Sequence, residues 1–225
     1  MRRQVLEILK SSDWPEALKA LRRASSRRVI APLFSALCSA DPQVKWRAVE
    51  AMGVLVSDMA SADMESARDV LRRLMWSLNE ESGSMGWGAP EAMGEIMAGH
   101  EQLAREFAPI LLSYIREGGN DIEHPLLRQG VFWGLVRLAE SNPSVLQSLK
   151  AEKSLVAHLS SRDPMIRGLA ARALGSFGSH KIRPKLEALL GDMTELTVYE
   201  DGQARTRHVG RMAEEALLKI KGGFP

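Results

Sequence analysis

The chain repeats itself with a period of about 41 residues, and this repetition limits its possible folds more than any other feature. The segment DPQVKWRAVEAMG, residues Asp41–Gly53, returns as DPMIRGLAARALG, residues Asp163–Gly175, after 122 residues, or about three periods. A shift of one period aligns Trp46 with Trp87. Repeats of this length are typical of proteins that stack one small unit on the next.

Each unit is predicted to be a pair of helices. Apolar residues recur at intervals of three and four, which places them on one face of a helix. In the first helix of a unit they are Ile30, Leu33, Phe34 and Leu37, and in the second Val44, Ala48, Ala51 and Leu55. Asp41 and Pro42 between them form a helix start, because the carboxylate caps free amides and proline needs no hydrogen-bond partner there.

The pattern of Asp-Pro, a β-branched residue, a basic residue, alanines and a closing glycine resembles HEAT-like repeats, particularly the short kind found in phycobilin lyases. Asp163–Gly175 matches this pattern closely, and Asp41–Gly53 matches it well. The resemblance implies an all-α fold, a right-handed α-solenoid of five to six helical hairpins. One domain is expected over residues 1–225, with repeats at about 1–24, 27–57, 66–99, 103–140, 143–178 and 181–221. The resemblance implies no catalytic residue.

One segment near the C-terminus departs from the helical period. In TELTVYEDGQARTRHVG, polar and apolar residues alternate on both sides of Asp201-Gly202, a strong signal for a tight hairpin turn. The sequence therefore predicts a β-hairpin at about 195–207, inserted between the two helices of the last repeat. The hairpin is expected to cap the end of the stack, with a binding arm as the alternative.

Three tryptophans are predicted to turn away from the core face of second helices. On a helical wheel Trp46 lies opposite Val44, and the same construction places Trp87 and Trp133 opposite the core of their own helices. Since second helices line the concave face of HEAT-like stacks, we expect a groove that binds a partner. The candidate binding residues are Trp46, Glu50, Glu80, Glu81, Trp87, Glu91, Gln129, Trp133 and Arg172.

The tryptophans also permit a second interpretation. Exposed indoles leave apolar area in water and are common at binding hot spots, which favours the groove. Alternatively, the rings pack between neighbouring repeats. The recurring glycines Gly53, Gly94 and Gly175 are interpreted as helix-end or repeat-consensus features rather than site residues.

The third unit replaces the Asp-Pro turn with NEESGSMGWGAPE, residues 79–91. Because Pro90 fits only the first turn of a helix, the helix is expected to begin near Gly88 or Ala89. Residues Ser82–Gly88 then form a glycine-rich loop that carries Trp87. It is either a recognition loop or an irregular junction between repeats, and it lacks the Gly-Lys-Ser/Thr of a phosphate-binding loop.

The charges and reactive residues argue against several functions. The net charge is about +5 over residues 1–30, −7 over 31–149 and +4 over 150–225, and an acidic middle disfavours nucleic acid as a partner. The five histidines show no metal-ligand spacing, so no metal or other cofactor is expected. The single cysteine, Cys38, is expected to be a buried, inert thiol on the inner side of a first helix.

These observations favour a non-catalytic interaction scaffold that holds a basic or amphipathic segment of another protein in an acidic, tryptophan-bearing groove. The expected location is the cytoplasm, because one thiol suits a reducing compartment and neither a signal peptide nor a membrane-spanning run is visible. The resemblance implies a first alternative, a tetrapyrrole or bilin lyase or chaperone-like protein, in which Arg172 pairs with a propionate. A second alternative is a nucleic-acid-binding solenoid.

Overall fold

The structure is a computed structural model that describes residues 2–24, 26–78, 86–200 and 202–221. It divides into two compact units, residues 1–103 and residues 104–225. The single domain predicted over residues 1–225 and its six repeat ranges stay predictions. Among the described residues, none of the helices combines the length and the hydrophobicity needed to cross a lipid bilayer.

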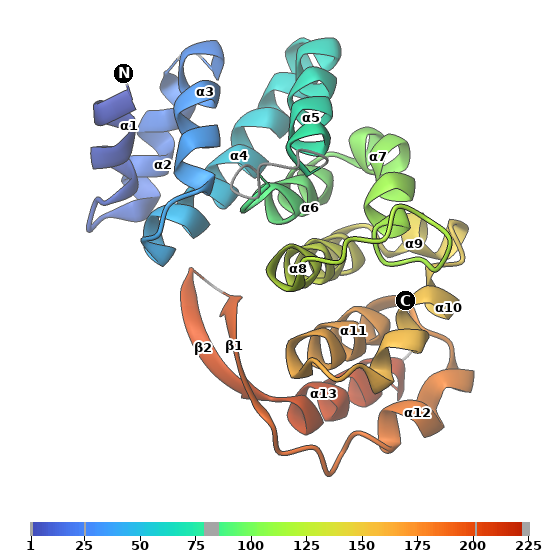
Figure 1. Cartoon of the computed structure of the whole chain (residues 1–225). Coiled ribbons are helices and arrows are strands. Elements are labelled where there is room, and N and C mark those ends of the chain that lie inside the picture. The colour runs from blue at the N-terminus through green and yellow to red at the C-terminus, as the bar shows by residue number, and fades with distance from the viewer. Residues whose placement is uncertain (1, 25, 79–85, 201, 222–225) are drawn as a thin grey trace. The chain divides into compact units, whose positions relative to one another are not determined.

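The described part of the N-terminal unit is built from helices (Figure 1). They are α1 (Arg2–Leu9), α2 (Trp14–Arg23), α3 (Ser26–Leu37), α4 (Pro42–Ala62), α5 (Met64–Leu78) and α6 (Ala89–Gly99). Helix α4 packs against α3, α5 and α6 and also contacts α1 and α2. It is therefore the central helix of this unit.

The C-terminal unit contains helices and one hairpin (Figure 1). Helix α7 (Glu101–Ser113) spans the boundary between the units. It is followed by α8 (Pro125–Ser141), α9 (Pro143–Ser148), α10 (Ala151–Ala157), η1 (His158–Ser160), α11 (Pro164–Phe177), η2 (His180–Ile182), α12 (Arg183–Glu187), β1 (Glu195–Glu200), β2 (Gln203–His208) and α13 (Val209–Lys221). Helix α11 packs against α8, α10 and α13.

The Asp-Pro motifs begin helices as predicted. An oxygen of the Asp41 carboxylate accepts hydrogen bonds from the backbone N–H of Gln43 at 2.9 Å and of Val44 at 3.4 Å. Asp163 caps α11 in the same way, accepting the N–H of Met165 at 2.8 Å. Each carboxylate satisfies amides that the helix leaves without an intrahelical partner.

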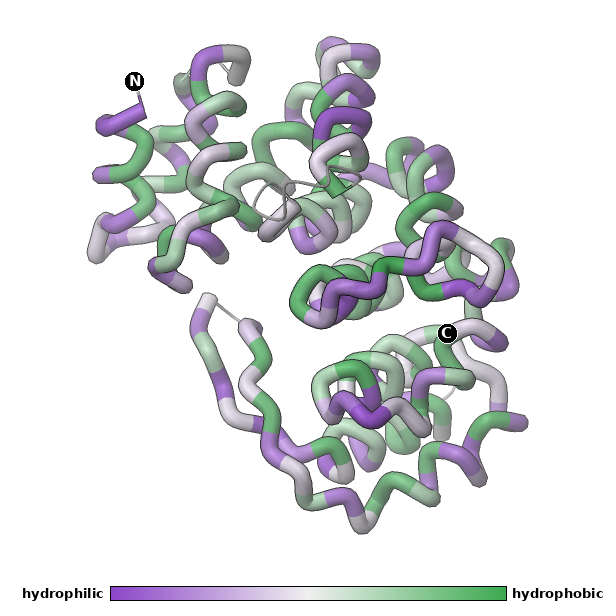
Figure 2. The backbone as a smooth tube through the Cα atoms, in the orientation of Figure 1, coloured by the Kyte–Doolittle hydropathy of each residue, from purple (hydrophilic) through white to green (hydrophobic). Residues whose placement is uncertain are grey.

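The second helix of a predicted pair, such as α11, is buried on most of its surface. The first helix of a pair, such as α5, is amphipathic. Of the fifteen residues of α5 only Ala67, Val70, Leu71 and Leu74 are buried, while ten of the fourteen residues of α11 are buried. Figure 2 shows the same contrast, with hydrophilic residues spread along α5 and hydrophobic residues dominating α11. A residue opposite the core face of a second helix therefore meets a neighbouring element more often than water.

Two glycines of the repeated motif let second helices touch. A Cβ atom at Gly53 of α4 would lie 2.8 Å from the Cβ of Glu95 in α6. A Cβ at Gly175 of α11 would lie 2.7 Å from the Cα of Ala216 in α13. The interpretation of Gly53 as a helix-end residue is wrong, since α4 continues to Ala62.

The predicted hairpin is confirmed. Strands β1 and β2 pair antiparallel, from Glu195 opposite His208 to Glu200 opposite Gln203, and they lie between α12 and α13. Leu196 and Val198 of β1 are buried, and β1 packs on α11. The hairpin thus covers a helix of the C-terminal unit with one apolar face of its first strand.

Candidate functional site

The candidate site of the N-terminal unit forms where α4 begins. The Asp41 cap fixes the first turn of α4, which places Lys45 and Trp46 one turn further along. The Lys45 ammonium lies 2.8 Å from the Glu91 carboxylate, and its nitrogen lies 4.9 Å from the centre of the Trp46 ring. One cation thus joins an acid of α6 to an indole of α4.

Glu91 is buried at 4% exposure, in contrast to the exposed position that the helical wheel predicts. The prediction fails because α6 packs against α4, which encloses the side of α6 opposite its own core face. A buried carboxylate needs a partner, and Lys45 supplies it. Glu91 therefore positions Lys45.

A depression of about 750 Å³ opens beside this pair and is named here the Trp46–Trp87 depression. Both indoles are partly exposed. The residues that line it include Arg2, Leu37, Cys38, Lys45, Trp46 and Trp87. Two predicted binding residues that are 41 positions apart in the sequence therefore line one hollow.

The end of the third-unit loop places Trp87 as predicted. Helix α6 begins at Ala89, and Gly88 before it has a φ of 76°. A Cβ atom at Gly88 would lie 2.9 Å from the carbonyl oxygen of Leu37, so the close approach and the positive φ both require glycine. Trp87 is thereby held against the end of α3, off the helix.

Cys38 corrects another expectation, since its side chain is exposed rather than buried. Helix α3 ends at Leu37, so Cys38 lies in the turn beyond it rather than on the inner side of the helix. Its sulfur lies 4.0 Å from the carbonyl oxygen of Trp87. Partial burial raises the pKa of the Cys38 thiol, although nearby Lys45 opposes the change.

Glu50 belongs to a cluster that holds the first two helices to α4. The indole N–H of Trp14 donates to a Glu50 oxygen at 2.7 Å. The Arg47 guanidinium lies 5.1 Å from the centre of the Trp14 ring and donates to the carbonyl oxygens of Leu9 at 2.8 Å and Ser11 at 2.7 Å. Trp14 and Arg47 are not among the binding residues that the sequence predicts.

In the C-terminal unit, Gln129 and Trp133 of α8 bond to neighbouring elements. The Gln129 amide donates to an Asp163 oxygen at 2.8 Å, and the Trp133 indole N–H donates to the carbonyl oxygen of Tyr199 at 2.9 Å. Trp133 is 8% exposed, so the packing interpretation describes this indole and the exposed one is wrong. The reason is the hairpin, whose first strand bonds to the Trp133 side chain.

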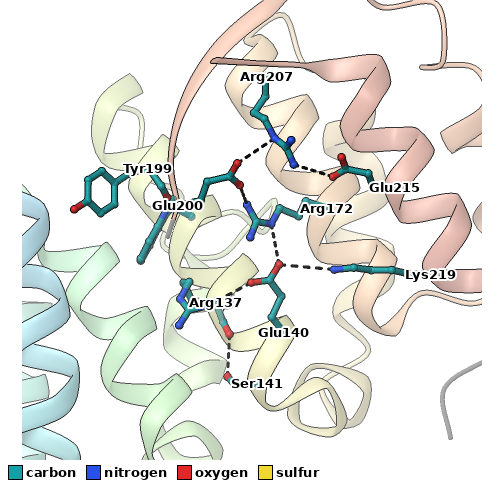
Figure 3. Close-up of polar contacts among 10 residues, drawn as sticks. Arg137, Glu140, Ser141, Arg172, Tyr199, Glu200, Arg207, Glu215 and Lys219 are labelled. Carbon is teal, nitrogen blue, oxygen red and sulfur yellow. Dashed lines mark hydrogen bonds and ion pairs between the residues drawn. The ribbon is translucent and has the colours of Figure 1, made fainter. Parts of the chain in front are cut away.

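Arg172 is the centre of an ion-pair network between α8, α11, the hairpin and α13 (Figure 3). Its guanidinium lies 2.8 Å from Glu140 and 2.6 Å from Glu200, and Glu200 also lies 3.1 Å from Arg207. Burial alone would lower the pKa of Arg172, but Glu140 and Glu200 together raise it above its ordinary value. Arg172 therefore stays charged and ties the hairpin to α8.

The structure thus separates the predicted site residues into three groups. Trp46, Trp87 and Glu91 meet at or beside one depression, while Glu50 lies in the Trp14 cluster. Gln129, Trp133 and Arg172 are bonded within the C-terminal unit. Glu80 and Glu81, with residues 82–85 of the glycine-rich loop, lie outside the described residues. No group of side chains suited to a metal ion occurs among the residues that the structure describes.

Comparison with solved structures supports a helical-repeat fold. The crystal structure of an engineered protein, 20% identical in sequence, matches 99% of this chain and 99% of its own with a TM-score of 0.55. A designed armadillo repeat protein in complex with the peptide (KR)4 is 19% identical and matches over 96% of this chain and 98% of its own, with a TM-score of 0.54. At these identities the likeness shows the fold alone.

No protein family and no curated protein matches the sequence. The likeness to solved structures shows that the chain has a helical-repeat fold. The finer resemblance to phycobilin-lyase-type HEAT repeats stays a prediction.

Proposed function

We propose that this protein is a non-catalytic interaction scaffold that holds an amphipathic segment of a partner protein in the Trp46–Trp87 depression. The observation that carries the proposal is the pair of partly exposed indoles around one hollow of about 750 Å³. Tryptophan contributes large apolar area at little entropic cost and is enriched at binding hot spots. An apolar side chain of the partner would insert beside the two rings.

The similar fold of a peptide-binding protein supports the proposal. One of the designed armadillo repeat proteins was solved with the peptide (KR)4 bound. A helical-repeat fold is thus able to hold a peptide, and the proposal extends that capacity to this chain. Glu80 and Glu81, close to Trp87 in the sequence, lie outside the described residues and stay predicted binding residues.

The charges around the depression favour an amphipathic segment over a basic one. The two described acids of the predicted site are engaged, since Glu91 pairs with Lys45 and Glu50 accepts the Trp14 indole N–H. Gln129, Trp133 and Arg172 are left out of the proposed site, because their polar groups bond within the C-terminal unit.

The two alternative functions gain no specific support. A tetrapyrrole bound through a propionate would compete with Glu140 and Glu200 for Arg172. Arg22, in the basic N-terminal segment, pairs with Asp58 through two hydrogen bonds of 2.7 and 2.9 Å. Because its charge is already paired, Arg22 would bind a phosphate less strongly. A cytoplasmic location stays a prediction.

The test is a selection of random displayed peptides on the full chain, followed by affinity measurements on variants. We expect the double substitution Trp46→Ala and Trp87→Ala to weaken selected peptides at least about tenfold, because it removes both apolar walls. The matched control is Trp76→Ala, since Trp76 is 72% exposed and lies on α5 outside the depression.

Thermal unfolding of each variant checks that the fold is retained. Equal affinity for the wild-type chain and the double tryptophan variant would refute the proposed site. An equal loss with Trp76→Ala would show that any exposed indole serves, which also contradicts the proposal.

A further inference from the structure

The charged side chains that line the Trp46–Trp87 depression have one sign. Arg2 and Lys45 are its charged lining residues, and no acidic side chain is among the described residues that form its wall. Arg2 is exposed on the first turn of α1, and Lys45 lies on the first turns of α4. A bound segment therefore meets positive charge from two helices.

Glu91 fixes the position of the Lys45 ammonium without using all of its hydrogen-bond donors. The Glu91 oxygen accepts one N–H at 2.8 Å, and Glu91 itself is buried. An ammonium group has three N–H donors. The Lys45 side chain is 23% exposed, and Lys45 is one of the residues that line the depression.

The Trp46 ring is already used by a cation of the chain itself. The Lys45 nitrogen lies 4.9 Å from the ring centre, within the range of a cation–π contact. A basic side chain of a partner would compete with Lys45 for this ring face and be repelled by it. An acidic side chain would instead meet Lys45 on its exposed side.

We infer that the partner segment presents a carboxylate to Lys45 and Arg2, next to an apolar side chain that packs between Trp46 and Trp87. This inference rests on the proposed function and names the chemistry of the partner. Glu91 acts as a positioning residue, because it holds the Lys45 ammonium without lining the depression. The occupant is thus an acidic amphipathic segment of another protein.

The test selects a displayed library of random peptides against the full chain and removes binders of the double variant Trp46→Ala, Trp87→Ala. We expect the remaining peptides to be enriched in Asp or Glu beside an apolar residue. Replacing that acid by its amide is expected to weaken binding about tenfold, and (KR)4 is expected not to compete.

Variants of the protein assign the acid to Lys45. Lys45→Met is expected to weaken the peptide about tenfold and to abolish the difference between acid and amide peptides, whereas Lys45→Arg retains that difference. Arg2→Met is expected to have a smaller effect in the same direction, since Arg2 is more exposed. Circular dichroism checks folding, and the acid-to-amide change in the peptide needs no protein variant.

The outcomes separate the two proposals. Selected peptides rich in Lys or Arg, or an acid-to-amide effect that persists in Lys45→Met, overturn this inference while the scaffold function stands. If no peptide remains once binders of the double tryptophan variant are removed, the proposed function fails as well.

Discussion

The Lys45 ammonium lies 2.8 Å from the carboxylate of Glu91, a residue 46 positions further along the chain. This ion pair links the first turns of two second helices, α4 and α6. It lies at the edge of the depression lined by Trp46 and Trp87. The contact therefore contributes to the stability of the N-terminal unit and to the charge of its candidate site.

Breaking this pair from the Glu91 side is expected to destabilise the protein. Glu91→Gln should cost about 1–3 kcal/mol of unfolding free energy, because it leaves a partly buried ammonium without its counter-charge. The double substitution Lys45→Met with Glu91→Leu should recover much of that loss, since it removes both charges. Urea unfolding of the three variants measures this, and a Glu91→Gln variant as stable as the wild type would contradict it.

The close approach of second helices predicts that replacing a glycine at the contact by alanine lowers the free energy of unfolding. Gly53→Ala and Gly175→Ala place a methyl group within 3 Å of Glu95 and Ala216, respectively. Each is expected to lose about 1–3 kcal/mol through overpacking, reduced by the better helix propensity of alanine. The control is Gly191→Ala, where an added Cβ meets no atom within 4 Å. Unchanged urea midpoints for both helix variants would disprove the packing argument.

The bond from Trp133 to Tyr199 predicts that the hairpin depends on a helix far from it in sequence. Trp133→Phe keeps most of the apolar area but removes the donor to the Tyr199 carbonyl, at an expected cost of about 1–3 kcal/mol. Hydrogen exchange should speed up in β1 and β2. Trp76→Phe is the matched control, because Trp76 is 72% exposed. Equal exchange rates in both variants would rule out this role.

The lowered pKa of Asp192 predicts that the protein loses part of its unfolding free energy in acid. Burial would raise its pKa, but hydrogen bonds from Thr194 and Arg167 together lower it below the ordinary value of 3.8. A carboxyl whose pKa is lower in the folded state contributes stability above its unfolded pKa, and that contribution disappears as pH falls through the folded pKa. Asp192→Asn should therefore lose less stability than the wild type below about pH 4. An equal loss of unfolding free energy in the two proteins across this pH range would refute the prediction.

The sequence was sufficient for the features that depend on local chemistry. Asp41 and Asp163 cap helices because their carboxylates accept N–H groups that the first turn leaves without a partner. The pair Asp201-Gly202 between alternating residues indicated the hairpin correctly, and Pro90 located the start of α6. Each of these signals lies within a few residues of the feature that it predicts.

The sequence was insufficient where contacts come from distant elements. Trp46 and Trp133 occupy equivalent faces on a helical wheel, yet Trp46 lines a depression and Trp133 is covered by a strand 66 residues away. Arg47 donates to the backbone carbonyls of Leu9 and Ser11. Because every residue has a carbonyl, no residue type in the sequence indicates these bonds. Glu91 was expected in water because the wheel cannot show that α4 covers it.

The most direct test of the proposed site uses Cys38, the single cysteine of the chain, which is exposed and lines the Trp46–Trp87 depression. The rate of its alkylation by a maleimide is measured with and without a saturating selected peptide. We expect the peptide to slow alkylation at least about tenfold in the wild-type chain and to slow it far less in the double tryptophan variant. An alkylation rate that the bound peptide does not change in the wild-type chain would refute the proposed site.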